Sequence, residues 1–565
     1  MESKVSKVRQ NEPLSKIQNK NNCNTIRYIS FNVNGAKTLF NYHPWNQLQQ
    51  NYDLFFNLLE GDVISLQELK LSPSNISNVN IGNLAKFKSF ISLPKTKKGY
   101  SGVGLFVRIP EPDEPEIVRH NLTVVKAEEG LTGFLNSADY PQSRYRDLDK
   151  ALLIGGYPEE IDEMKGLKID SEGRCVCIEL ASNIVVFSLY CPANSIGSEE
   201  GESYRLEFLK ILLDRCHYLK HIMGKDVIIV GDINVSLDLI DHADTMNEKV
   251  KQKIVKPVRN GEGNSGTEFE KINYKQCMDF KVSTPARKLL NSYTISTLDP
   301  SLANRSGSQF LYDTTRYTQG RRMGMYTVWN TLTGARQSNY GSRIDLILTS
   351  SDVLLKSISK ADIWPYIMGS DHCPIFTDFE IRDSKHLHVT GPIKLKFEAR
   401  LFYKLVKHRD ISQMFSVGQP KNIKSDSESD SSSKKRKIEY VSRKTTPVPK
   451  NQQTSIGNFF FKENSNFPTV EKGLVSYRET EPVNKFINEP AYMKPTSIIS
   501  ISNLIHGEAP ECYHGDKCKL KTSLLNTKTR GKKFWCCPRT TKAEAGNDNG
   551  SKVGEHQCSF FKWVK

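Results

Sequence analysis

The sequence contains no apolar run near the length of about 18 residues that a membrane-spanning helix needs. Residues 1–20 carry scattered lysines and no continuous apolar segment, which argues against a secretory signal peptide. Hydrophobic residues make up only 38% of the 565 positions, a low share for a single compact globule. We therefore expect a soluble, intracellular protein with no membrane partner, in which part of the chain is unpacked linker.

Cysteine is scarce in most of the chain and concentrated near its end. Five of the twelve cysteines lie at Cys512 or beyond it. In a reducing compartment such clustering indicates metal binding rather than disulfide bonds. Residues 509–565 also carry 12 Lys and Arg against 5 acidic residues and are too few for a large core, so a bound metal would stabilise this segment.

Acidic residues do not balance the basic ones. The chain has 79 Lys and Arg against 63 Asp and Glu, which leaves a net charge of +16. This excess favours a polyanionic partner, either nucleic acid or an anionic membrane, but a basic surface can also serve solubility alone. Charge by itself leaves both interpretations open.

Short apolar runs separated by turn residues occupy the region from Ile26 to Phe397. They are rich in β-branched residues and bounded by Gly, Asp, Asn or Ser, as strands are. Between them lie stretches such as residues 202–219, where apolar residues recur at intervals of three and four, as in helices. Because many of the strands are continuously apolar, we predict an α/β fold in which helices cover the sheets.

The composition changes after Asp410. Residues 418–450 contain clustered Ser, alternating charge blocks and few apolar residues, so burial cannot offset the entropy lost on ordering them. We predict a disordered N-terminus over residues 1–25, a large domain over 26–400, a disordered linker over 410–508 and a small domain over 509–565.

Polar residues stand where the predicted strands end, and one segment places an acid beside an imidazole. These residues are Asn32, Glu68, Asp232, Asn234, Asp345, Asp371 and His372. Oxygen ligands with one imidazole suit Mg²⁺ or Mn²⁺ better than zinc. A lone carboxylate at a strand end is more often a cap or an ion-pair partner, so the predicted metal site depends on the whole set converging.

Seven segments in this region carry a resemblance to a known family. They are FNVNG (31–35), LQELK (66–70), GYSGVGLFVR (99–108), DSEGR (170–174), GDINV (231–235), SRIDLIL (342–348) and GSDHCPI (369–375). In this order they resemble the endonuclease/exonuclease/phosphatase superfamily and, within it, the exonuclease III-like class II AP endonucleases. The resemblance covers residues 26–380 and implies a catalytic domain built as a four-layered α/β sandwich, with two facing sheets flanked by helices.

The resemblance also implies roles in metal-dependent phosphodiester hydrolysis. Glu68 would be the main carboxylate ligand of Mg²⁺ (or Mn²⁺), with Asn32 and Asp371 completing or supporting the shell. Asp232 would activate the attacking water, and Asn234 would orient or hydrogen-bond the phosphate.

Three further roles follow from the same resemblance. Asp345 would hold His372 in one tautomer so that the imidazole faces the phosphate, and Tyr190 would donate to the developing phosphate charge. A site with two ions would add Asp232, Asn234 and His372 as ligands, and the sequence leaves the number of ions open.

Some positions depart from the major endonucleases of the family. Asn34 stands where they usually carry Asp, Ala193 where they carry Asn, and Ser342 where they often carry an aromatic residue. With residues 333–345 and 128–133, these changes resemble the second AP endonuclease subfamily. They shift the expected activity from abasic-site incision toward 3′-phosphodiesterase and 3′→5′ exonuclease activity. The sequence leaves open the balance between endonuclease and 3′-end activities.

The linker contains two short motifs. Residues 453–460 fit Q-x-x-I-x-x-F-F and resemble the peptide that binds the sliding clamp PCNA, anchored by Gln453, Ile456, Phe459 and Phe460. A chance aromatic pair is the alternative. Residues 434–437, KKRK, indicate a nuclear localisation signal and hence a nuclear protein, unless they are a solvated charge run.

The tail resembles a GRF-type zinc finger. The resemblance implies a closed, structural Zn²⁺ site formed by Cys512, His514, Cys537 and Cys558. Cys518 and Cys536 are close competitors for these positions.

The signature Gly-Arg-x-Phe of such fingers is Gly-Lys-Lys-Phe in this chain. Lys532, Lys533 and Trp535 suit single-stranded DNA, because the charges meet the backbone and the ring stacks on a base. The alternative is that the aromatic rings of the tail only form the small core of the finger.

Together these features predict a monomeric, nuclear DNA repair hydrolase of base excision repair, which cleaves at abasic sites and at blocked or recessed 3′ ends. One alternative is a phosphatase or deadenylase of the same fold. The other is a non-catalytic scaffold that bridges the clamp and single-stranded DNA. The role of a probable insertion around residues 242–285 stays open.

Overall fold

The structure of the chain is a computed structural model, which describes residues 13–95, 99–194, 197–258, 265–296, 298, 309–381, 393–405, 509–522, 533–539, 558 and 561–563. They belong to two compact units, one within residues 1–464 and one within 465–565. The linker predicted over 410–508, with its two motifs, lies outside the described residues. No helix within the described ranges has the length and apolar character needed to cross a membrane.

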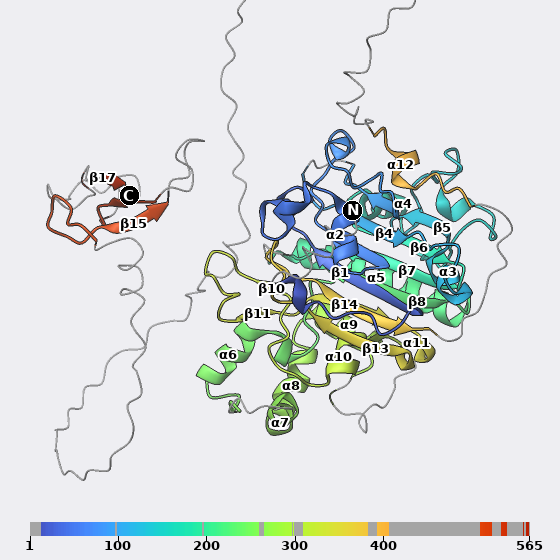
Figure 1. Cartoon of the computed structure of the whole chain (residues 1–565). Coiled ribbons are helices and arrows are strands. Elements are labelled where there is room, and N and C mark those ends of the chain that lie inside the picture. Colours follow the sequence, from blue (N-terminus) through green and yellow to red (C-terminus); the bar gives the residue numbers. More distant parts are fainter. Residues whose placement is uncertain are drawn as a thin grey trace, which may run out of the picture. The chain divides into compact units, whose positions relative to one another are not determined.

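Two six-stranded mixed sheets form the large unit (Figure 1). The first has the order β13-β14-β1-β2-β4-β3, with strands β1 (Thr25–Asn32), β2 (Val63–Gln67), β3 (Phe87–Ser92), β4 (Val103–Arg108), β13 (Ile358–Ile363) and β14 (Ile375–Glu380). The second has the order β5-β6-β7-β8-β12-β9, with strands β5 (Val124–Glu129), β6 (Cys175–Leu180), β7 (Ile184–Tyr190), β8 (Asp226–Asp232), β9 (Tyr312–Asp313) and β12 (Asp345–Thr349). A small ribbon, β10 (Val328–Trp329) with β11 (Gly341–Ser342), lies apart from both sheets.

The two sheets face each other across one apolar core and carry further cores on their outer faces. Val63 of the first sheet and Val186 of the second belong to the core between them. Along β7, the neighbours Val185 and Phe187 point the other way and pack under helix α5. Burial on both faces explains why the strands are apolar without alternation. The predicted four-layered α/β sandwich is confirmed.

Helices and single 3-10 turns cover the sheets and connect the strands. The helices are α2 (Tyr52–Leu58), α3 (Glu116–Leu122), α4 (Glu163–Asp170), α5 (Glu199–His221), α6 (Ala243–Lys251), α7 (Ser265–Ile272), α8 (Tyr274–Lys281), α9 (Pro285–Tyr293), α10 (Thr314–Gln319), α11 (Asp352–Lys356) and α12 (Ala399–Phe402). The 3-10 turns are η1 (Leu14–Lys16), η2 (Thr38–Asn41), η3 (Trp45–Leu48), η4 (Ile76–Asn78), η5 (Tyr145–Asp147) and η6 (Leu239–Asp241).

The insertion suspected around residues 242–285 forms helices α6, α7 and α8, drawn in green beside the sandwich in Figure 1. It has a small core of its own, which includes Val255, Phe269 and Phe280. The insertion is therefore a structured addition to the sandwich rather than an extended loop.

The N-terminal segment differs from its predicted disorder. Residues 13–25 include a 3-10 turn, and the buried Leu14 and Ile17 join the outer core of the first sheet. Gln18 accepts a hydrogen bond from the indole N–H of Trp364 at 2.8 Å. Two apolar residues in this lysine-rich stretch provide enough burial to hold it against the sheet, which composition alone did not reveal.

The small unit contains a three-stranded antiparallel sheet. Its strands are β15 (Lys519–Thr522), β16 (Lys533–Cys536) and β17 (Phe561–Trp563), with β16 in the centre. Buried cysteines and Trp535 form its core.

Candidate active site

Strand register brings the predicted polar residues to one edge of the sandwich. Because β1 and β2 run parallel, Asn32 at the end of β1 lies beside the residue that precedes Glu68. In the second sheet, Asp232 at the end of β8 is paired in register with Tyr190 of β7 and with Asp345 of β12. The ends of β1, β2, β7 and β8 and the start of β12 thus carry these side chains.

The amide of Asn32 joins the two sheets at this edge. Its Nδ2 donates to Glu68 Oε1 at 2.9 Å and to Asp232 Oδ2 at 3.0 Å. Ligand atoms of Glu68, Asp232 and His372 all lie within 4.8 Å of one another, and all three side chains are buried. Two buried carboxylates this close repel each other unless a cation lies between them, so the donor set fits a divalent metal ion.

His372 is held by Asp345. Its Nδ1 lies 2.9 Å from Asp345 Oδ2, and its Nε2 lies 3.9 Å from Asp232 Oδ2. Burial alone would lower the pKa of His372, but the Asp345 carboxylate outweighs it and raises this pKa to about 10. The ring is therefore an imidazolium at neutral pH and presents Nε2–H toward the carboxylate cluster.

The two carboxylates of the cluster differ in basicity. Burial, and then the neighbouring Asp345 carboxylate, raise the pKa of Asp232 to about 8. Burial would also raise the pKa of Glu68, but Lys70 and the Asn32 amide outweigh burial and lower this pKa. Asp232 is thus the more basic of the two carboxylates, and Glu68 is the one that stays ionised to lower pH.

Asp371 stands outside the three-residue cluster and reaches it through Asn34. Asn34 Nδ2 donates to Asp371 Oδ1 at 2.9 Å, and Asn34 also accepts a hydrogen bond from Lys70. The Lys70 Nζ lies 2.9 Å from Glu68 Oε2. The sequence reasoning gave Lys70 and Asn34 no role, although both lie in the segments FNVNG and LQELK.

Three of these residues have left-handed backbones. The φ angles are 52° at Glu68, 48° at Asn34 and 56° at Asn234. This conformation is uncommon for residues other than Gly and is strained for Glu, whose side chain gives no local compensation. Strain at the residue that supplies a carboxylate to the cluster is typical of a functional site.

Asn234 is oriented by two hydrogen bonds. Its backbone N–H donates to Asp232 Oδ1 at 3.0 Å, and its Nδ2 donates to the carbonyl of Cys191 at 2.8 Å. These bonds tie the loop after β8 to the loop after β7. Asn234 therefore lies beside Asp232.

Tyr190 stacks with an arginine that the sequence reasoning did not assign. The Arg174 guanidinium lies 4.9 Å from the ring centroid of Tyr190 and 5.1 Å from that of Tyr100. Its Nη1 donates to the Tyr190 carbonyl at 3.1 Å. Burial, and then the Glu68 carboxylate, raise the pKa of Tyr190 well above its usual value, so the phenol remains a donor. Arg174 is the last residue of the segment DSEGR (170–174), and its place in that segment is the sequence feature that could have identified it.

The loop before Asp371 is fixed by Arg336. The guanidinium donates to the carbonyls of Ser370 at 2.9 Å, Ile367 at 2.7 Å and Pro365 at 3.2 Å, and lies 4.5 Å from the ring centroid of Trp329. These contacts fix the backbone that immediately precedes Asp371 and His372 and so help to position both residues.

The small unit contains a second metal-type cluster. Ligand atoms of Cys512, His514, Cys537 and Cys558 lie within 4.8 Å of one another, and no described atom of Cys518 or Cys536 belongs to this set. Four N and S ligands fit zinc.

The thiol of Cys537 is suited to act as a zinc ligand. Desolvation raises its pKa, but hydrogen bonds from the backbone at Arg539 and Cys558 outweigh that effect and lower the pKa to about 6. The thiolate that zinc requires is therefore favoured.

The predicted DNA-binding residues of the tail are not equally available. Lys533 is exposed, but Trp535 is only 6% exposed and packs among the cysteines of the small core. Its ring is not presented for base stacking, because the finger is too small to form a core without it. Lys532 lies outside the described residues, as do Gln453, Ile456, Phe459 and Phe460.

Comparison with known proteins places the chain in a family. No family model matches. The chain is 40% identical over 553 residues to DNA-(apurinic or apyrimidinic site) endonuclease 2 of Saccharomyces cerevisiae, a match that covers 96% of this chain and 97% of that one. The protein of the same name from Schizosaccharomyces pombe is 34% identical over 355 residues, which are 63% of this chain and 58% of that one.

One solved structure also matches part of this chain. The crystal structure of the Xenopus laevis APE2 catalytic domain matches 63% of this chain and 92% of that one, with 25% identity and a TM-score of 0.45. The near full-length match to the budding-yeast protein carries the conclusion: this chain belongs to the DNA-(apurinic or apyrimidinic site) endonuclease 2 family, among the exonuclease III-like nucleases.

Proposed function

We propose that this chain is a divalent-metal-dependent DNA repair phosphodiesterase that incises abasic sites and acts on blocked and recessed 3′ ends as a 3′-phosphodiesterase and 3′→5′ exonuclease. The observation that carries the proposal is the buried cluster of Glu68, Asp232 and His372 where the two sheets meet. The names of the family's members support the substrate class, since they are DNA-(apurinic or apyrimidinic site) endonucleases.

In this proposal Glu68 and Asp232 hold Mg²⁺ or Mn²⁺, with Asn32 orienting both carboxylates and Asp371 acting through Asn34. The bound ion would supply positive charge beside the scissile phosphate. If a second ion binds, Asp232, Asn234 and His372 would be its ligands, with His372 then in its neutral imidazole form.

The protein's own groups supply the remaining steps. Asp232, whose pKa is the higher of the two cluster carboxylates, takes the proton of the attacking water. Asn234 hydrogen-bonds the phosphate. The His372 imidazolium, held by Asp345, and the phenol of Tyr190 donate to phosphate oxygens as negative charge builds up.

The accessory segments complete the proposal. The small unit binds one structural Zn²⁺ through its Cys3His cluster and contacts single-stranded DNA with Lys532 and Lys533. Residues 453–460 bind PCNA, and residues 434–437 direct the monomeric protein to the nucleus. The proposal rests on motif identity for the segments that lie outside the described residues.

The purified full-length protein should incise an abasic duplex and degrade a recessed 3′ end in Mg²⁺, and EDTA should stop both reactions. Asp232→Asn should lower both rates by about 10³-fold, because it removes the proton acceptor and a metal ligand. Asp113→Asn, the same change at an exposed loop residue, should leave both rates unchanged. Near-normal turnover by a folded Asp232→Asn protein would contradict the assignment.

The two alternatives give different results in the same assay. A phosphatase or deadenylase would hydrolyse a phosphomonoester or poly(A) RNA and leave both DNA substrates intact. A scaffold would bind DNA and cleave nothing. A non-catalytic scaffold does not account for the buried carboxylate–imidazolium cluster, and the names of the relatives favour neither alternative.

A further inference from the structure

Helix α9 is attached to the loop that follows Asp232. Arg287 Nε donates to the carbonyl of Ser236 at 2.9 Å, and Asn291 Nδ2 donates to the carbonyl of Leu237 at 3.2 Å. Ser236 is two residues beyond Asn234, which the proposed function places on the phosphate. Residues at the start of α9 are therefore carried close to the phosphate-binding loop.

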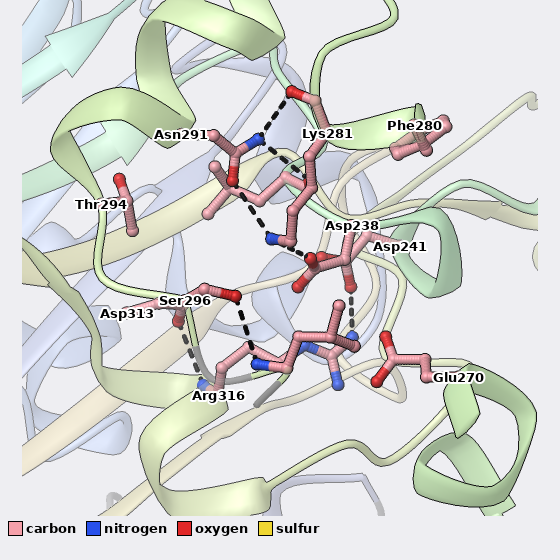
Figure 2. A network of polar contacts seen from close by, with 12 residues as sticks. Asp238, Asp241, Glu270, Phe280, Lys281, Asn291, Thr294, Ser296, Asp313 and Arg316 are labelled. Atoms are coloured by element: carbon pink, nitrogen blue, oxygen red, sulfur yellow. Dashed lines mark hydrogen bonds and ion pairs between the residues drawn. The ribbon is translucent and has the colours of Figure 1, made fainter. Parts of the chain in front are cut away.

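Cations elsewhere in this part of the fold are neutralised. Figure 2 shows the buried network at the base of the insertion, where Lys281 contacts Asp238, and Arg316 contacts Asp241. Within the same network Arg321 pairs with Glu270 of α7. Within this network, each of these buried cations therefore has a carboxylate partner.

Arg287 of helix α9 differs from these cations in the groups that it contacts. Its guanidinium donates to Ser283 Oγ and to the Ser236 carbonyl and lies 3.7 Å from the ring centroid of Phe280, so all three partners are neutral. No carboxylate among the described residues forms an ion pair with it. Burial, and then the Arg205 guanidinium, lower the pKa of Arg287 to about 10, so it still carries its charge at neutral pH.

Arg205 of α5 is the second cation of this pair. One of its Nη atoms donates to Glu202, but its Nε is buried without a hydrogen-bond partner. Glu202 also accepts from Asn194 Nδ2 at 3.1 Å, in the loop that follows Tyr190. Glu202 thus compensates Arg205, and no described carboxylate forms an ion pair with Arg287, so the two arginines together carry one uncompensated positive charge.

We propose that Arg205 and Arg287 together bind a non-scissile backbone phosphate of the DNA strand that is cleaved, next to the scissile phosphate. A phosphodiester carries one negative charge, which matches the uncompensated charge of the pair. Guanidinium forks bind phosphate oxygens in a bidentate manner, and such contacts fix the register of the strand without reading its sequence. This inference depends on the proposed function, because it assumes that DNA binds at the cluster of Glu68, Asp232 and His372.

The test uses the full-length protein in Mg²⁺ and a duplex with a recessed 3′ end. A series of substrates replaces one phosphate at a time near that end with a neutral methylphosphonate. The wild-type protein should lose about tenfold in kcat/KM at one non-scissile position. Arg287→Gln should lose about the same factor on unmodified DNA and show no further loss at that position, since the contact is already absent.

Salt dependence gives a second readout that a purely structural role would not change. The slope of log KM against log salt concentration should decrease by about one unit in Arg287→Gln and stay close to the wild-type slope in Arg287→Lys. Lys288→Gln removes the same charge from the next, exposed residue of α9 and should reproduce the wild-type methylphosphonate profile. If Arg287→Gln does not fold, Arg205→Gln takes its place in both measurements.

The outcomes separate the two proposals. If the wild-type protein cleaves DNA but Arg287→Gln keeps the wild-type methylphosphonate profile and salt slope, the arginine pair is structural and the inference is overturned, while the proposed function stands. If the wild-type protein cleaves no DNA substrate, both are overturned.

Discussion

Replacing Asp345 by Asn changes the charge of His372 with little change in shape. The Asp345 carboxylate is the main reason that the pKa of His372 stands at about 10 instead of below its usual 6.5. Asp232 and Asp371 also raise this pKa, but less than Asp345 does. Asp345→Asn removes the largest of these effects, so the pKa of His372 should fall and a larger share of the ring should be neutral at pH 7.5.

The pH–rate profile measures this change. In the wild-type protein, kcat on a recessed 3′ end in Mg²⁺ should show no loss from deprotonation of His372 until the pH approaches 10. In Asp345→Asn, kcat at pH 7.5 should fall at least tenfold, and it should recover part of this loss toward pH 6 as the imidazolium reappears. Asp113→Asn serves as the matched control at an exposed position.

The free energy of unfolding should also depend on pH, because the pKa of His372 differs between the folded and the unfolded protein. Because the folded-state pKa of His372 is raised, its contribution is complete below pH 6.5 and disappears as the pH rises through about 10. In urea unfolding, the gap between wild type and Asp345→Asn should therefore narrow across this window. A variant with the wild-type pH–rate profile and a gap that does not depend on pH would refute the role of Asp345.

Further predictions concern other parts of the chain. Glu68→Gln should raise the Mg²⁺ concentration for half-maximal rate at least tenfold, measured by metal titration of the nuclease rate, because a neutral amide is a weak ligand; an unchanged titration would contradict its role. Asp241→Asn should lower the free energy of unfolding by about 3–5 kcal/mol, measured by urea unfolding, since it leaves the buried Arg316 without a carboxylate partner and leaves Arg343 with Asp313 alone. Cys537→Ala should abolish zinc binding, read by metal analysis, and remove single-stranded DNA binding with it; a variant that still binds one zinc would exclude Cys537 as a ligand. Phe459→Ala combined with Phe460→Ala should remove PCNA binding in a calorimetric titration and leave nuclease activity without PCNA unchanged.

Part of the geometry of the cluster follows from local patterns. Glu68 and Asp232 stand where short, largely apolar strands end, and parallel pairing brings the ends of β1 and β2 together in one sheet and those of β7 and β8 together in the other. The approach of Glu68 to Asp232 depends on how the two sheets pack, which the sequence pattern does not specify. Asp371 was expected near the metal, but its contact is mediated by Asn34, a detail that depends on side-chain rotamers.

Other features depend on contacts between residues distant in sequence. Arg205 and Arg287 lie on different helices, and it can be seen only after α5 and α9 are packed together that Arg205 pairs with Glu202 whereas Arg287 pairs with no described carboxylate. The burial of Trp535 likewise follows from the small size of the finger, in which few other large side chains are available to form a core. Patterns within short segments carry no information about either arrangement.

The hydrogen bonds of Asn32 have a consequence for how activity depends on the integrity of the fold. The first sheet contributes Asn32, Glu68 and His372, and the second contributes Asp232 and Asp345, so neither sheet contains a complete set of ligands. A shift of one sheet against the other by one or two ångströms would separate the carboxylates before any strand lost its backbone pairing. Loss of packing between the two sheets would therefore inactivate the enzyme while its secondary structure is still intact. A cation bound to residues of both sheets would oppose that displacement.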